Sequence, residues 1–315
     1  MVTIADIRAA GTNVGERIHR TPLLGSTRLG EALGLELFVK AELFQKTGSF
    51  KVRGVLNRIH RLSPAERERG LIGISAGNHA QALAWAATAA GVRSTVVMPA
   101  HASPTKVAAS RAYGADVVLH GDVFAAFDRM HELRERHGYT LVHPFDDEDV
   151  IAGHGTLGLE IVTDLPDADV VIVPVGGGGL LSGVATAVKA LRPATRVIGV
   201  EPEGAANLRA ALDAGHVVRL ERIDTIADGL APPMTGAHVL EHVRAAVDDV
   251  VTVTDASILE AMKLLMTRMK LFVEPSGAAA LAALLSHRIA DCSGRRVAIV
   301  ASGGNLDLDR LKGML

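Results

Sequence analysis

Short apolar runs alternate with segments of helical period along almost the whole of this 315-residue chain. Glycine and proline bound the apolar runs, and the segments between them carry apolar residues every three to four positions. This alternation is typical of parallel strands that are linked by crossover helices. We therefore predict an α/β protein. The length suits two domains, because a domain usually has roughly 150 residues.

The predicted elements fall into two series, after a strand at Leu37–Lys40 and a helix at Phe50–Leu62 that Ser49 is expected to cap. The first series is a small doubly wound unit that comprises strand Leu71–Ile74, helix His79–Ala90, strand Ser94–Met98, helix Thr105–Tyr113, strand Asp116–Leu119, helix Phe124–His137 and strand Thr140–His143. The second comprises strand Val170–Val175, helix Leu180–Leu191, strand Val197–Val200, helix Asn207–Ala214, strand Val250–Val253, helices Ser257–Met269 and Pro275–Ser286, and strand Val297–Ala301.

Composition excludes several classes of protein. Lys and Arg number 33 against 35 Asp and Glu, which gives a net charge of −2 and no broad positive field for a nucleic acid. The single cysteine, Cys292, excludes an internal disulfide and thiolate metal clusters. Since the chain has neither a long apolar run nor a signal-like start, we expect a cytoplasmic protein with no membrane or nucleic-acid partner.

Four glycines, Gly176, Gly177, Gly178 and Gly179, follow the predicted strand at Val170–Val175 and precede a predicted helix. They leave the backbone open to an anion, and the start of a helix adds free N–H groups and the positive end of its dipole. The run lacks the GxGxxG spacing of a dinucleotide site. We therefore predict a seat for a single phosphate ester, with a tight turn as the alternative.

Lys51 falls in the first turn of its predicted helix, where the dipole disfavours a cation. A disfavoured ammonium has a lowered pKa, and a neutral amine is the form that attacks a carbonyl carbon. From the local sequence alone, however, a surface lysine whose stem packs on Phe50 is the favoured interpretation.

Two further loops follow predicted strands. Ser75–His79 offers hydroxyl, amide and helix-start N–H donors for a carboxylate or a ring oxygen, although Asn78 could instead only cap the helix. Ser302–Asn305 ends the last strand and offers a hydroxyl to a heterocycle nitrogen, although such a sequence is often only a turn.

Together these loops resemble one family over essentially the whole chain. The motifs are KAELFQKTGSFKVRG at Lys40–Gly54, SAGNHAQ at Ser75–Gln81, GGGGL at Gly176–Leu180, TIADG at Thr225–Gly229, EPSGA at Glu274–Ala278 and SGGN at Ser302–Asn305. Their order and spacing are similar to those of the pyridoxal-phosphate enzymes that include threonine dehydratase and serine racemase. The resemblance implies fold type II, in which the cofactor lies in a cleft between two doubly wound, open, twisted sheets.

The resemblance also implies a role for each motif. Lys51 would form the Schiff base with the cofactor and be the catalytic residue, and Phe50 would pack on the cofactor ring. Asn78 would bond the phenolic oxygen of the cofactor, and Ser302 would face its pyridine nitrogen. The cofactor phosphate would be held by Gly176, Gly177, Gly178, Gly179 and the amide of Leu180. The substrate carboxylate would be held by Ser75, Asn78 and His79.

The expected reaction is the dehydration of L-threonine, and of L-serine, to 2-oxobutanoate or pyruvate with release of ammonia. Serine racemases need a second base opposite the lysine, and Ala76 stands at that position. Serine racemization and 3-hydroxyaspartate dehydration remain alternatives, and a non-catalytic protein that binds the cofactor or an amino acid is the alternative from a different class.

The resemblance leads to three further expectations. A divalent cation could bind at Glu201 and Ala205, although Asn207 replaces the carboxylate expected beside them. The chain is expected to be a short form without a regulatory domain, and to assemble as a homodimer or homotetramer. Residues 1–51 and 147–315 are expected to form a large cofactor-binding domain, and residues 52–146 a small one.

Overall fold

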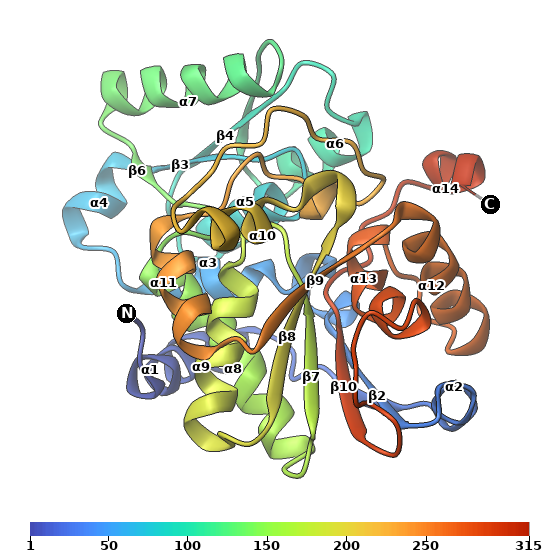
Figure 1. Ribbon diagram of the computed structural model, residues 1–315. Helices are drawn as coiled ribbons and strands as arrows, with labels where there is room; N and C mark the ends of the chain where they lie inside the picture. Colours follow the sequence, from blue (N-terminus) through green and yellow to red (C-terminus); the bar gives the residue numbers. More distant parts are fainter. Residues whose placement is uncertain (315) are drawn as a thin grey trace.

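The computed structural model describes residues 1–314 and contains two separate sheets, each flanked by helices (Figure 1). The α/β class and the two-sheet architecture predicted from the sequence are thus confirmed. The smaller sheet lies at the top of Figure 1 and the larger one below it.

The larger sheet has six strands in the order β1-β2-β10-β7-β8-β9. All neighbours are parallel except β1 and β2, which are antiparallel. The strands are β1 (Leu23–Gly25), β2 (Glu36–Ala41), β7 (Val170–Pro174), β8 (Arg196–Pro202), β9 (Asp249–Val253) and β10 (Arg296–Ala301). The central strands β7 and β10 are almost continuous runs of buried aliphatic residues, which is expected where helices cover both faces of a parallel sheet.

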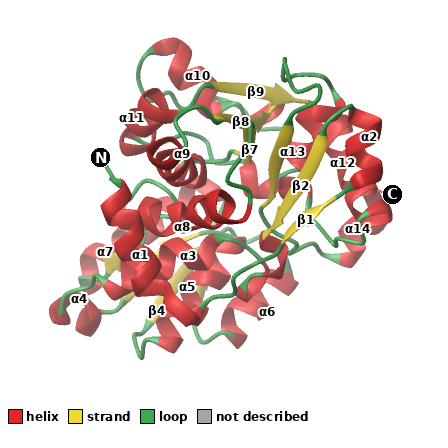
Figure 2. Cartoon of the chain, turned by 90° about the horizontal axis from the view of Figure 1, so that it is seen from below, coloured by secondary structure: helices red, strands yellow, loops and turns green. Residues whose placement is uncertain are grey.

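Helices cover both faces of the larger sheet (Figure 2). The helices that share a buried core with one face are α2 (Thr27–Leu33), α12 (Asp255–Arg268) and α13 (Pro275–Leu285). Those on the other face are α1 (Ile4–Val14), α8 (Glu148–Asp164), α9 (Gly179–Leu191), α10 (Asn207–Ala214) and α11 (Ala237–Ala246). Helix α14 (Leu308–Met314) ends the described chain.

The smaller sheet has four parallel strands in the order β5-β4-β3-β6. They are β3 (Leu71–Ile74), β4 (Ser94–Met98), β5 (Asp116–Leu119) and β6 (Thr140–Leu141). Helices α3 (Lys51–His60), α5 (Asn78–Ala89) and α6 (Pro104–Ala112) share a core with one face, and α7 (Val123–His137) packs on the other. Helix α4 (Pro64–Arg69) connects α3 to this sheet. The helices on both faces make this sheet doubly wound, as predicted.

Every predicted strand and helix exists, but the bounds differ by a few residues at some ends. The strand predicted at Thr140–His143 ends at Leu141. Ser49 does not cap α3: Phe50 occupies the N-cap position, and the Ser49 hydroxyl is buried without a hydrogen-bond partner in residues 1–314. Asn78 is the first residue of α5 rather than its cap, which is Gly77.

The sequence did not predict α8, although it has 17 residues. Its three glycines weaken the helical pattern, and tertiary packing explains them. A Cβ at Gly153 would lie 2.7 Å from the Cα of Gly54 in α3, and one at Gly158 would lie 2.8 Å from the Cβ of Ala187 in α9. The glycines therefore let α3 and α9 approach α8 closely.

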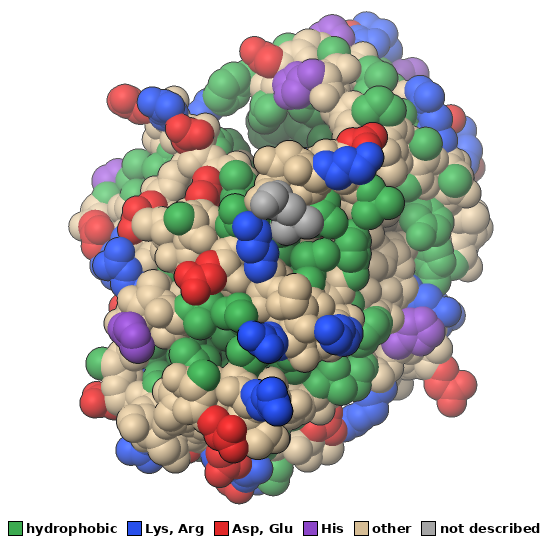
Figure 3. Space-filling view, turned by 90° about the vertical axis from the view of Figure 1, so that its right-hand side faces the viewer, with side chains coloured by type: hydrophobic (Ala, Val, Ile, Leu, Met, Phe, Trp, Pro, Cys, Tyr) green, Lys and Arg blue, Asp and Glu red, His purple; other side chains and the backbone are tan. Residues whose placement is uncertain are grey.

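Within residues 1–314, no helix is both long and apolar enough to cross a membrane. Basic and acidic side chains are mixed over the face shown in Figure 3. This mixture is consistent with the small net charge of the chain.

Candidate active site

Lys51 begins α3, as the sequence predicted, and its side chain is partly buried. Its Nζ donates a hydrogen bond to the carbonyl oxygen of Pro144 at 2.7 Å and lies 5.1 Å from the centroid of the Phe50 ring. Burial lowers the pKa of Lys51 to about 8. The lowered pKa that the sequence suggested is therefore present, with desolvation as its cause.

The loop before Lys51 is hydrogen-bonded to the loop after β10. The Phe50 N–H donates to the Ser302 carbonyl at 3.2 Å, and the Gly304 N–H donates to the Gly48 carbonyl at 3.0 Å. Ser49 and Gly303 form an antiparallel bridge between these bonds. The structure thus places buried Ser302 directly beside the lysine loop.

Asn78, at the start of α5, joins the same cluster through its side chain. Its Nδ2 donates to Glu274 Oε1 at 2.6 Å, and its Oδ1 accepts from Asn305 Nδ2 at 2.8 Å. Asn305 also donates to the Thr47 carbonyl at 2.7 Å. Glu274 is buried, and this burial raises its pKa to about 7. Three of the predicted loops therefore meet at one polar cluster.

The other residues predicted to bind the substrate carboxylate lie in the same turn. The Ser75 hydroxyl accepts from the Gly77 N–H at 3.0 Å. The ring of His79 points elsewhere, because its Nε2 lies 3.0 Å from the Val142 carbonyl. Burial, with a smaller contribution from Lys51, lowers the pKa of His79 to about 3, so its imidazole is neutral. What His79 can offer a carboxylate is its backbone N–H at the start of α5.

The four glycines lie where predicted, between the end of β7 and the first turn of α9. Gly178 has a φ of +91°, which favours glycine. A Cβ at Gly176 would lie 2.9 Å from the carbonyl oxygen of Gly229, and one at Gly179 would lie 2.6 Å from that of Phe145. Close packing thus also requires glycine here, while the first N–H groups of α9 remain available to an anion.

Phe145 connects the glycine loop to Lys51. A Cβ at Gly177 would overlap the Phe145 ring, and the preceding residue, Pro144, accepts the hydrogen bond from Lys51. His154 on α8 lies beside the residue that precedes Lys51, because its ring centroid is 4.8 Å from that of Phe50. The structure therefore brings all four predicted loops together around Lys51.

Most of the buried side-chain nitrogen and oxygen atoms that lack a hydrogen-bond partner in residues 1–314 lie in or beside these loops. They are Thr47 Oγ1, Ser49 Oγ, His79 Nδ1, both ring nitrogens of His154, Ser182 Oγ and Asn207 Oδ1. Buried polar groups are rarely left unpaired. Those of Thr47, Ser49, His79 and His154 lie near Lys51, which indicates a site built for a polar ligand.

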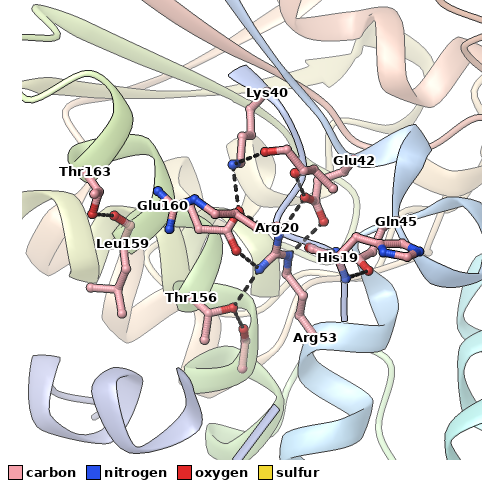
Figure 4. A network of polar contacts seen from close by, with 12 residues as sticks. His19, Arg20, Lys40, Glu42, Gln45, Arg53, Thr156, Leu159, Glu160 and Thr163 are labelled. Atoms are coloured by element: carbon pink, nitrogen blue, oxygen red, sulfur yellow. Dashed lines mark hydrogen bonds and ion pairs between the residues drawn. The ribbon is translucent and has the colours of Figure 1, made fainter. Parts of the chain in front are cut away.

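A buried ion network holds α3 in place (Figure 4). Arg53 donates to both carboxylate oxygens of Glu42 at 2.8 Å, to both of Glu160 at 2.7 and 3.0 Å, and to Thr156 Oγ1 at 3.1 Å. Burial would lower the pKa of Arg53, but the two carboxylates outweigh it and raise that pKa. All five N–H donors of the Arg53 guanidinium are thus hydrogen-bonded. Arg53 lies two residues after Lys51 in α3.

The predicted cation ligands are Glu201, near the end of β8, and Ala205, in the short helical turn that follows β8. Both carboxylate oxygens of Glu201 accept backbone N–H groups, from Leu208 and from Arg209, each at 2.8 Å. Within residues 1–314, no three His, Cys, Asp or Glu side chains are grouped so that they could hold a metal ion. A cation at Glu201 and Ala205 remains a prediction.

Sequence reasoning singled out the EPSGA motif but gave no role to Glu274, and it missed His154 and Pro144. The acid before Pro275 was a usable signal, because a carboxylate beside a helix start tends to meet donors there. His154 and Pro144 could not be identified, because their importance comes only from their proximity to Lys51 in the folded chain.

Residues 14–303 match the family described as pyridoxal-phosphate dependent enzymes. The chain belongs to this family. It is 44% identical over 312 residues to the L-threonine ammonia-lyase of Thermotoga maritima, covering 99% of this chain and 77% of that protein. It is 42% identical over 312 residues to the catabolic L-threonine dehydratase of Escherichia coli, covering 98% and 95%.

Solved structures of the pyridoxal-phosphate family have the same fold. A threonine deaminase from T.th. has a TM-score of 0.91 and 45% identity, with 97% of this chain and 99% of that one covered. A serine racemase from maize has a TM-score of 0.94 and 37% identity, with 99% and 96% covered. The expected type II fold of pyridoxal-phosphate enzymes is thereby confirmed.

The residues around Lys51 fit pyridoxal phosphate (PLP). A partly buried lysine with a lowered pKa suits an aldehyde, and the glycine-lined start of α9 suits a phosphate. The buried, unpaired polar atoms nearby suit the remaining polar groups of such a ligand.

Proposed function

We propose that this chain is an L-threonine ammonia-lyase, which converts L-threonine to 2-oxobutanoate and ammonia, and L-serine to pyruvate and ammonia. The observation that carries the proposal is the partly buried Lys51, with its lowered pKa, at the meeting point of the four loops. Relatives named as threonine ammonia-lyases and dehydratases, similar over almost the whole chain, support this choice of substrate.

We assign Lys51 as the residue that holds PLP and moves the proton of the substrate α-carbon. An amine takes up a proton only in its neutral form, and the lowered pKa of Lys51, about 8, makes that form more available near neutral pH than in an ordinary lysine. The carbonyl of Pro144 fixes one N–H of Lys51 and so orients its Nζ. PLP, when bound, supplies an electron-withdrawing ring that stabilises the negative charge left on the α-carbon.

The surrounding loops would position the ligands. The start of α9, with Gly176, Gly177, Gly178, Gly179 and Leu180, would hold the phosphate of PLP, and Ser302 would face its ring nitrogen. Phe50 would pack on the ring. Ser75, the Asn78 side chain and the His79 N–H, at the start of α5, would hold the substrate carboxylate. Asn78 would also bond the phenolic oxygen of PLP, because Glu274 uses only one of its two amide hydrogens.

Serine racemization is a second candidate, because serine racemases of 37% and 40% identity have TM-scores of 0.94 and 0.91 with this chain. A racemase must return a proton to the other face of the α-carbon. Ala76 lies in the loop between β3 and α5, and its methyl group can neither take up nor donate a proton. This favours elimination, which needs a base on one face only.

The two sheets support a division into two domains. The strands of the smaller sheet lie between residues 71 and 141, and those of the larger sheet lie at 23–41 and 170–301. We propose residues 52–146 as the small domain, and residues 1–51 with 147–315 as the large one. Lys51 would then mark the boundary between them.

The experiment that tests the function measures 2-oxobutanoate and ammonia formed from L-threonine by the protein saturated with PLP. We expect turnover by the wild-type chain and a loss of at least about a hundredfold in Lys51→Ala, since removing a positioned acid–base group typically costs that much. Lys46→Ala is the matched control, because Lys46 lies in the same segment of the chain and should be dispensable.

Parallel assays with L-serine and 3-hydroxyaspartate define the substrate range, and chiral analysis of the product from L-serine detects racemization. D-serine formed faster than pyruvate would identify a racemase. A preparation that binds PLP but turns over none of these amino acids would instead support the non-catalytic binding protein.

A further inference from the structure

Three backbone carbonyl groups from separate segments converge on the side chain of Asn207. Its Nδ2 lies 3.1 Å from the oxygen of Gly176 in the glycine loop, 3.3 Å from that of Pro232, and 3.4 Å from that of Ala205. Asn207 is fully buried at the first position of α10. The amide thus joins the glycine loop to two other segments of the larger domain.

The chemistry of this position requires a positive or hydrogen-donating group. Three carbonyl oxygens that face one another carry partial negative charge, and only a donor or a cation between them makes the arrangement favourable. The amide of Asn207 supplies two N–H donors for the three acceptors. The opposite amide orientation would turn Oδ1 toward the three carbonyls, so the hydrogen-bond network fixes the donor side.

A carboxylate at position 207 would behave differently. It has no hydrogen to donate, so it would repel the three carbonyl oxygens unless a cation lay between them. Oxygen ligands of this kind suit Mg²⁺ or Ca²⁺. In this chain the Ala205 carbonyl faces the Asn207 amide, and the oxygens of Glu201 accept the N–H groups of Leu208 and Arg209. The donor set therefore does not fit the divalent cation expected from the sequence.

We propose that the Asn207 amide replaces a divalent cation in this chain. It anchors Gly176, and hence the loop that receives the phosphate of PLP, without any metal ion. Asn207 is a positioning residue in this assignment, because it acts on the phosphate through the glycine loop. The proposal depends on PLP binding to the loop and is independent of which amino acid is the substrate.

The test titrates the PLP-free protein with PLP and follows the visible absorbance band, in EDTA and then in MgCl₂ or CaCl₂. We expect the wild-type Kd for PLP and the melting temperature of the PLP-free protein to be the same in all three buffers. A wild-type Kd that rises about tenfold in EDTA and recovers with Mg²⁺ or Ca²⁺ would overturn the proposal. This arm needs no variant, so it decides even if a substitution prevents folding.

Two substitutions isolate the amide. Asn207→Ala removes the donor and should raise the Kd at least about tenfold in every buffer, as expected for unpaired buried carbonyls. Asn207→Asp should show a similar loss in EDTA and recover affinity and melting temperature with Mg²⁺ or Ca²⁺. Wild-type affinity in Asn207→Ala, or an Asn207→Asp protein that neither cation restores, would contradict the proposal.

The matched control is Asn13→Asp, which makes the same chemical change in α1, where Asn13 donates to Asn57. Its Kd for PLP should equal that of the wild-type chain in EDTA and in Mg²⁺. An equal loss in Asn13→Asp would show that a charge change anywhere weakens PLP binding, and would contradict a specific role for Asn207.

Discussion

At the scale of single residues, the site depends on burying groups that prefer water. Glu274 is buried and Lys51 is partly buried, and desolvation raises the pKa of Glu274 to about 7 and lowers that of Lys51 to about 8. Each shift favours the neutral form of the group near neutral pH. The amide of Asn78, bonded to Glu274 and to Asn305, is therefore held by a carboxyl group that is partly protonated at pH 7.

The raised pKa of Glu274 predicts a dependence of stability on pH. Between about pH 4.5 and 7 the unfolded chain loses the Glu274 proton while the folded chain keeps it, so the contribution of Glu274 to stability falls as pH rises. Glu274→Gln removes this titration. The free energy of unfolding of Glu274→Gln, relative to that of the wild-type chain, should therefore rise by up to about 3 kcal/mol as the pH increases from about 4.5 to 7.5.

Urea unfolding of the PLP-free proteins across this pH range measures the difference. Glu221→Gln is the control, because Glu221 is exposed and its substitution should leave the pH profile of the wild-type chain unchanged. A constant difference between Glu274→Gln and the wild-type chain would show that Glu274 ionises alike in the folded and unfolded states.

Residue roles could be predicted only where a motif carries them. The lysine, the four glycines and the loops at Ser75–His79 and Ser302–Asn305 are motifs, and the structure brings them together. The partners of Asn78 could not be predicted, because Glu274 and Asn305 lie 196 and 227 residues further along the chain. Phe145 and Gly177, which pack together, are 32 residues apart, so no local pattern could predict their contact either.

At the scale of elements, the position of Lys51 depends on how α3 is held. The five hydrogen bonds of Arg53 tie the first turn of α3 to Glu42 after β2 and to Thr156 and Glu160 in α8 (Figure 4). Burial would raise the pKa of Glu42, but Arg53 outweighs it and lowers that pKa. The charge of Glu42 is therefore not stable in the interior without Arg53.

Arg53→Met should therefore destabilise the protein strongly. It leaves the fully buried Glu42 without its cation, and breaking a buried pair in this way typically costs about 3–5 kcal/mol. Arg20→Ala removes the exposed end of the same network, where Arg20 pairs with Asp164, and should cost at most about 1 kcal/mol. Urea denaturation measures both losses, and equal losses would refute the distinction between the buried and exposed ends.

The sequence predicted the helices that alternate with the central strands, but it missed the peripheral helices α1, α2, α4, α11 and α14 as well as the central helix α8. Its glycines at 153, 155 and 158 pack against neighbouring helices, so their role lies in tertiary contacts rather than in the helix itself. The antiparallel strand β1 was also missed, because three residues are too few to give a period.

At the scale of the whole molecule, the site lies where segments of both halves of the chain meet. Helix α6, beside the smaller sheet, contacts two later segments of the chain: Thr105 Oγ1 donates to Asp307 at 2.9 Å, and Lys106 lies 3.5 Å from Asp228. The class and the two sheets were predictable from the alternation of strands and helices, but these contacts between the sheets were not.

The resemblance to the PLP family also predicts a homo-oligomer. Light scattering combined with size-exclusion chromatography should give a molar mass two or four times the 33.0 kDa of one chain. A mass of one chain at micromolar concentration, with PLP bound, would contradict this expectation.

The central claim is that Lys51 carries PLP, and covalent trapping tests it most directly. The protein is mixed with PLP, reduced with borohydride, digested and analysed by peptide mass spectrometry, with Lys51→Ala treated in parallel. We predict one modified peptide, with the added mass on Lys51, and none in the variant. A wild-type protein that remains unlabelled, or that is labelled at a different lysine to the same extent in both proteins, would contradict the claim.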